Sequence, residues 1–169
     1  METKTVSSRM YSLIVLYDLH TKFFTKAIEG ISDKDAHSRL NTKANHIAWL
    51  TGSLVQERYE LTKSLSVNPE SYSEKQTADE LFKDHKGIQD NVTYPSLAEF
   101  KKDWDKITPV LRNALVNVSD EKLDSIFKMP EFTMPFFDLV TFIMYREANC
   151  IGQIALWRRL LGYEAIKYD

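Results

Sequence analysis

Residues 45–52 read Asn-His-Ile-Ala-Trp-Leu-Thr-Gly, and residues 146–154 read Arg-Glu-Ala-Asn-Cys-Ile-Gly-Gln-Ile. Arg146 and Cys150 are four residues apart, so on a helix their side chains share one face, with Cβ atoms about 5–6 Å apart. His46 belongs to the other segment, on a second predicted helix that we expect to pack nearby. The two segments therefore predict a polar site between two helices.

Hydrophobic periodicity predicts four long helices around these segments. They are expected to span residues 8–30, 42–65, 96–118 and 135–162. Ser96 and Glu99 form a capping-box pattern at the start of the third helix, and Pro109 predicts a kink or a break inside it. The chain has only 5 Gly and 5 Pro among 169 residues, which favours long helices over a turn-rich β fold.

A polar connection of about thirty residues, 66–95, joins the second and third predicted helices. Thr77 and Glu80 match a second capping box, so we expect a short helix over residues 78–86. The connection is too long for a hairpin between antiparallel helices, but it is long enough to cross a bundle. The prediction is an all-α single domain over residues 1–169, a four-helix bundle in up-down-down-up order with a long crossover between helices 2 and 3.

Composition narrows the classes of function. The apolar share of 43% and charged share of 27% are ordinary for a soluble globular protein. A net charge of −2 argues against nucleic-acid binding, and no apolar run reaches the roughly 18 residues that span a bilayer. The start of the chain lacks the pattern of a signal peptide. We expect a cytoplasmic protein with no nucleic-acid or membrane partner, and a homodimer as one possible assembly.

The two opening segments resemble the DinB-like (DinB/YfiT) superfamily of four-helix bundles. The resemblance rests on the patterns Asn-His-Ile-Ala-Trp-Leu-x-Gly and Gly-Gln-Ile-Ala-Leu-x-Arg-Arg-Leu-Leu-Gly, which occur at residues 45–52 and 152–162. It implies the same up-down-down-up topology. By the same resemblance, Gly152 is expected to permit close helix packing, and Gln153 to make a polar contact between helices.

The resemblance also implies a metal site that this chain has largely lost. Members with an intact site place one histidine in the first segment and two in a His-Glu-x-x-His-x-Gly-Gln pattern in the second. Those members include bacillithiol- and mycothiol-using transferases, in which a divalent metal lowers the pKa of a thiol or water. Here only His46 matches, while Arg146 and Cys150 occupy the other two positions.

Several residues are candidate metal ligands. A guanidinium stays protonated and offers only donors, so Arg146 cannot ligate a metal. His46 and Cys150 remain as candidates for zinc or nickel, with a third ligand unknown; the alternatives are His20, Glu147 or Glu57. The simpler interpretations are a hydrogen-bonded buried histidine at positions 46 and 20, and a small buried apolar side chain at position 150.

Arg146 has two interpretations that do not involve a metal. It either forms an ion pair in the space of the lost site, with Glu57, Glu147 or Asp18, or its planar fork binds a ligand carboxylate or phosphate. Arg146 and Glu147 are accordingly the candidate ligand-binding residues.

These residues support two main hypotheses of function. The favoured hypothesis is a metal-free or weakly metal-binding descendant that binds a small anionic or thiol ligand, or a protein partner. The alternative is a divalent-metal-dependent thiol transferase or hydrolase, and a purely structural bundle is a third. Whether the protein is an enzyme stays open, and no catalytic residue is assigned.

Overall fold

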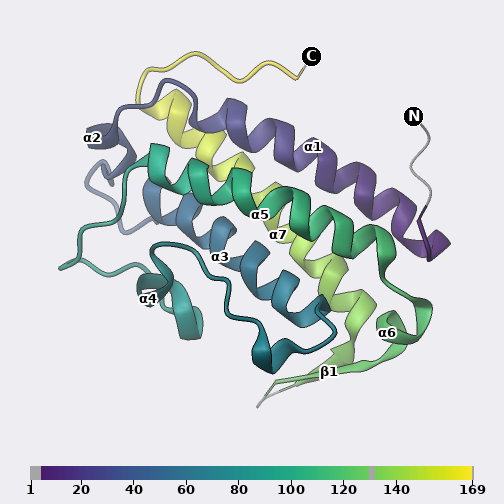
Figure 1. The fold of residues 1–169 in the computed structure, drawn as a ribbon. Helices are drawn as coiled ribbons and strands as arrows, with labels where there is room; N and C mark the ends of the chain where they lie inside the picture. The colour runs from purple at the N-terminus through teal and green to yellow at the C-terminus, as the bar shows by residue number, and fades with distance from the viewer. Residues whose placement is uncertain (1–4, 130–131, 169) are drawn as a thin grey trace.

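The fold is built on four long helices, seen in a computed structural model that describes residues 5–129 and 132–168 (Figure 1). The helices are α1 (Tyr11–Ile28), α3 (Ile47–Leu65), α5 (Leu97–Asn117) and α7 (Phe136–Leu160). Both α1 and α3 pack against α5 and α7. In Figure 1, α1 and α7 run in one direction, and α3 and α5 run in the other. The prediction of a mostly helical, all-α fold is confirmed.

Short elements fill the connections between the long helices. They are η1 (Ser8–Met10), α2 (Asp33–Ala36), η2 (Pro69–Ser71), α4 (Asp79–Phe82), η3 (Lys83–His85), α6 (Asp120–Asp124), β1 (Ile126–Lys128) and β2 (Thr133–Pro135). The two strands pair antiparallel, with Phe127 opposite Met134. Hydrophobic periodicity does not predict this hairpin, because its three-residue strands are too short for a clear alternating pattern.

The third predicted helix is one continuous element. Its capping box is present in α5, where the Ser96 hydroxyl accepts the Glu99 N–H and the Glu99 carboxylate accepts the Ser96 N–H. The helix continues through Pro109 to Asn117, so the predicted break does not occur. Ile107 and Leu111 are buried on either side of the proline, and this packing supports the helix where a backbone hydrogen bond is missing.

The predicted short helix over residues 78–86 is present as α4 followed by η3. Its predicted capping box is wrong, because α4 has no side-chain cap. The Thr77 N–H and hydroxyl instead donate to the Asp103 carboxylate on α5, at 2.6 and 3.3 Å. These bonds attach the long connection to α5.

The core divides into two apolar clusters along the four long helices. One contains Phe24, Leu50, Leu54, Phe100, Trp104, Ile154 and Trp157, and the other contains Met10, Ile14, Leu61, Leu111, Leu115, Phe136 and Val140. On every long helix, the residues between these two sets include a buried or half-buried polar side chain. A layer of polar side chains, among them His20, Arg58 and Glu147, therefore lies between the two apolar clusters.

Candidate functional site

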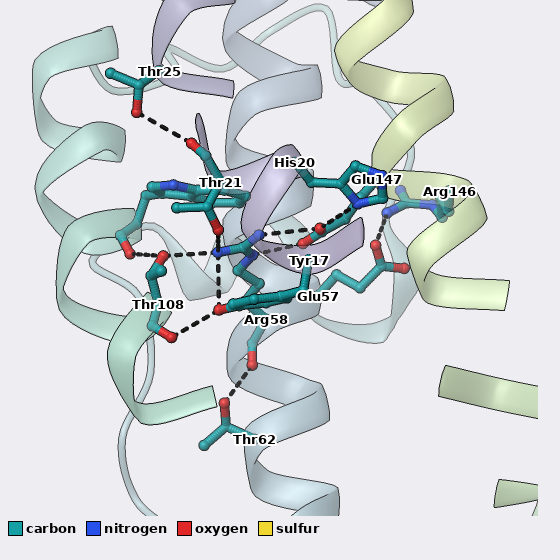
Figure 2. Close-up of polar contacts among 11 residues, drawn as sticks. Tyr17, His20, Thr21, Thr25, Glu57, Arg58, Thr62, Thr108, Arg146 and Glu147 are labelled. Atoms are coloured by element: carbon teal, nitrogen blue, oxygen red, sulfur yellow. Dashed lines mark hydrogen bonds and ion pairs between the residues drawn. The ribbon is translucent and has the colours of Figure 1, made fainter. Parts of the chain in front are cut away.

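A fully buried ion pair joins α3 to α7 in this layer (Figure 2). Arg58 Nε donates to Glu147 Oε1 at 2.6 Å, and Nη2 donates to Oε2 at 3.1 Å. On α1, His20 Nδ1 lies 3.2 Å from Glu147 Oε2. Both carboxylate oxygens therefore have partners, and the two side chains have no exposed surface.

Arg58 connects all four long helices. Its Nη1 donates to Tyr17 Oη (3.0 Å), Thr21 Oγ1 (3.1 Å) and Thr108 Oγ1 (2.8 Å). Its guanidinium also stacks between the rings of Trp104 and Tyr17, 3.4 and 4.1 Å from their centroids. These contacts offset the cost of removing the charge from water.

The electrostatics of Glu147 favour its charged form. Burial acts to raise the pKa of its carboxyl, but the Arg58 charge and the hydrogen bonds from His20 and Arg58 together lower it below its ordinary value. Glu147 is thus a carboxylate held inside a closed network. The structure places Glu147, a predicted ligand-binding residue, in the core, where its side chain has no exposed surface.

A cavity of about 560 Å³ lies beside the network, between α3, α7, the β hairpin and the segment containing α4 and η3. Its polar lining includes Ser53, Gln56, Glu57, Glu60, Lys86 and Arg146. Its aromatic lining comprises Trp49, Phe82, Phe127, Phe132 and Phe142. The cavity therefore combines an apolar wall with a small group of charged side chains.

Arg146 lies at the charged part of the cavity and pairs with Glu57 (Figure 2). Its Nη1 donates to Glu57 Oε2 at 2.8 Å, and its Nη2 donates to Ser53 Oγ at 2.6 Å. The Arg146 side chain keeps 29% of its surface exposed, and that of Glu57 keeps 14%. The predicted ion pair at Arg146 is confirmed, with Glu57 as its partner.

The protonation states of this pair differ from those of the buried pair. Burial raises the pKa of Glu57 to about 7, with Glu147 and Glu60 adding to the effect and Arg146 opposing it. Burial acts to lower the pKa of Arg146, but the charge of Glu57 outweighs it and the pKa is raised. Arg146 is thus a fixed cation, whereas Glu57 changes its charge near neutral pH.

His46 has a structural role at the start of α3. Its Nδ1 accepts the N–H of Trp49 at 3.0 Å, which makes it the N-cap of the helix. Its ring lies beside those of His37 and Tyr94, with centroids 5.4 and 5.2 Å away. Burial, with the His37 charge adding to it, lowers the pKa of His46 to about 4, so the ring is neutral at physiological pH.

The residues at the predicted metal positions do not fit a metal site. Burial raises the pKa of Cys150, against the opposing charge of Arg146, and this favours the neutral thiol over the thiolate that a metal needs. His20 is engaged with Glu147. Over residues 5–129 and 132–168, no three His, Cys, Asp or Glu side chains are grouped so that they could hold a metal ion.

The expectations for Gly152 and Gln153 are wrong. A Cβ added at Gly152 would meet no atom within 4 Å, and Gln153 Nε2 donates to Asn149 on the same helix. Both residues are exposed, because they lie on the outer face of α7. The close packing that was expected at Gly152 occurs instead at Gly52 on α3, against Phe82 and Phe100.

Fold and site together define a mostly helical protein with a buried charged layer and an adjacent cavity that has an aromatic wall and contains an arginine. No protein-family model matches the chain, and no curated protein matches it. No helix within the described part of the chain is long and apolar enough to cross a membrane. The cytoplasmic location, the absence of a nucleic-acid partner and the homodimer stay predictions.

Proposed function

We propose that this protein is a metal-free descendant of the DinB-like bundles that binds a small organic anion, with Arg146 as its anchor. The observation that carries the proposal is the position of Arg146, a partly exposed cation in an otherwise largely apolar cavity. The parallel direction of α3 and α5, and the long crossover between them, support the up-down-down-up topology (Figure 1).

The chemistry of the cavity favours a carboxylate attached to an apolar body. A guanidinium presents paired N–H donors in one plane, a geometry that matches a carboxylate. Aromatic side chains, among them Phe127 and Phe142, offer apolar surface to the rest of the ligand. The volume of about 560 Å³ is in the range of small-molecule sites.

Octanoate and 4-phenylbutyrate are therefore expected to stabilise the protein. A ligand at about 100 times its Kd adds about 2.7 kcal/mol to the free energy of unfolding, which a thermal-shift assay detects. Arg146→Gln is expected to abolish the shift, because it removes the guanidinium that pairs with the carboxylate and leaves the cavity walls in place. Arg159→Gln is the matched control, since Arg159 is an exposed arginine in the last turn of the same helix.

Octanol and octylamine replace the carboxylate of octanoate by a hydroxyl and an amine. They therefore separate the contribution of Arg146 to binding from that of the apolar cavity walls. Equal stabilisation by the alcohol would show that apolar contact alone drives binding, and stabilisation by the amine alone would assign the site to cations. No stabilisation by any carboxylate at millimolar concentration would contradict the proposed function.

The metal-dependent alternative has its own expected result. Untagged protein equilibrated with zinc or nickel and then desalted is expected to retain far less than one ion per chain, because the His46 ring already caps α3 and Arg146 occupies a ligand position. Elemental analysis measures this directly. One zinc per chain that disappears in His46→Ala would restore the thiol transferase or hydrolase hypothesis.

A further inference from the structure

Arg146 already has a carboxylate partner before any ligand arrives. Glu57 accepts one hydrogen bond from its Nη1, and both side chains line the cavity. A ligand carboxylate on the same guanidinium would bring a second negative charge against a single positive one. Two carboxylates that share a site cannot both ionise freely, so the pKa of one is raised.

The charged groups of α3 and α7 that act on Glu57 do not relieve this conflict. From α7 it faces Arg146, Glu147 and Cys150, and from its own helix α3 it faces Glu60. Glu147 is neutralised by the buried Arg58, and Glu60 adds negative charge. His85 and Lys86 line the same cavity from the long connection.

Of the two carboxylates, Glu57 is the one that can leave the Arg146 guanidinium. Its hydrogen bond to Arg146 uses one donor, while Arg146 Nη2 is directed to the neutral Ser53 hydroxyl. Burial already raises the pKa of Glu57 to about 7, so its protonation costs little near neutral pH. Once protonated, its carboxyl gains an O–H that can donate to the incoming carboxylate.

We propose that the ligand carboxylate replaces Glu57 on the Arg146 guanidinium, and that Glu57 takes up one proton from solvent as the ligand binds. This inference rests on the proposed function. The balance is simple: the Glu57–Arg146 ion pair breaks, a ligand–Arg146 ion pair forms, and the proton cancels the added negative charge. No covalent bond changes.

The exchange makes affinity depend on pH in a defined direction. Below about pH 6 Glu57 is largely protonated before binding, so the Kd for octanoate is expected to be nearly constant. Above about pH 7 the Kd is expected to rise by up to about tenfold per pH unit, since each binding event must then bring a proton with it. Glu57→Gln imitates the protonated side chain and is expected to make the Kd independent of pH.

Isothermal titration calorimetry of octanoate into the full chain tests the exchange. Titrations at about pH 8 in two amine buffers, imidazole and Tris, whose ionisation enthalpies differ, are expected to give an uptake of about one proton per ligand. At about pH 6 the uptake is expected to approach zero, and Glu57→Gln is expected to remove it at both values. The wild-type measurement alone tests the idea if the variant does not fold.

The outcomes separate this inference from the proposed function. Wild-type binding without proton uptake at about pH 8, or uptake that persists in Glu57→Gln, would overturn the exchange and leave the anion site standing. Persisting uptake would assign the proton to His85 or Glu60 instead. A wild-type protein that binds no carboxylate at either pH would overturn the proposed function itself.

Discussion

Replacing Arg58 by methionine is expected to lower the free energy of unfolding by about 3–5 kcal/mol, because Glu147 is then left buried without its charge partner. Neither side chain has any exposed surface, and the paired hydrogen bonds of 2.6 and 3.1 Å would both be lost. Urea unfolding followed by circular dichroism measures the change. The loss is expected to shrink at acid pH, since an unpaired Glu147 has a raised pKa and its protonated form is better tolerated.

Two further variants define what this result means. Arg58→Met/Glu147→Met is expected to recover most of the lost stability, because it removes both charges from the core. Lys101→Met removes a cation from the exposed Lys101–Asp105 pair and is expected to cost less than about 0.5 kcal/mol. If Arg58→Met stayed within about 1 kcal/mol of the wild type at neutral pH, the buried pair would have no large role in stability.

The sequence contains a signal for the buried Arg58–Glu147 pair. Arg58 lies four residues after Leu54 and three before Leu61, so it falls on the buried stripe of its helix. Glu147 lies four residues after Ile143 and four before Ile151, so it falls on the buried stripe of α7. A charge at a core position requires a partner. Sequence alone does not say which helices face each other, and so it leaves the partner open.

The partner of Arg146 could not be identified from the sequence alone either. Glu57, Glu147 and Asp18 were all candidates from the sequence. In the structure Glu147 pairs with Arg58, and Asp18 pairs with Arg112. Glu57 is the candidate that pairs with Arg146. Which carboxylate pairs with Arg146 therefore depends on the other ion pairs, and these depend on how the four long helices pack.

The cavity was harder to predict from the sequence than either ion pair. Its walls combine residues of α3 and α7 with Phe82 from the long connection and Phe127 from the β hairpin. The helix pattern predicted the first two elements, because long amphipathic segments carry a strong periodic signal. The hairpin carries no such signal, and its position beside α7 is set by tertiary packing.

His46, a predicted metal ligand, has a structural role instead. It lies at the start of α3, where its imidazole accepts the Trp49 N–H as a helix cap. A cap satisfies a backbone donor that would otherwise lack a partner. A histidine can therefore keep a structural role at this position without any metal.

Gly52→Ala is expected to have the second large effect, a loss of about 1–3 kcal/mol or more from overpacking. An added Cβ would overlap the Phe82 ring and lie 2.7 Å from Cε1 and Cζ of Phe100. Both rings are almost fully buried, so neither moves without disturbing the core. Because Phe82 also lines the cavity, the variant is expected to weaken octanoate binding. Urea unfolding and calorimetry measure the two effects.

Gly152→Ala is the matched control, since it makes the same change in the other long helix that contains a glycine. Position 152 is exposed with no atom within 4 Å of an added Cβ, so alanine is expected to stabilise the protein by about 0.5–1 kcal/mol through its higher helix propensity. Adding Phe82→Leu to Gly52→Ala is expected to restore part of the lost stability by making room for the methyl group. A Gly52→Ala protein as stable as the wild type, or stabilised as Gly152→Ala is expected to be, would mean that α3 does not pack against these rings as closely as the structure places it.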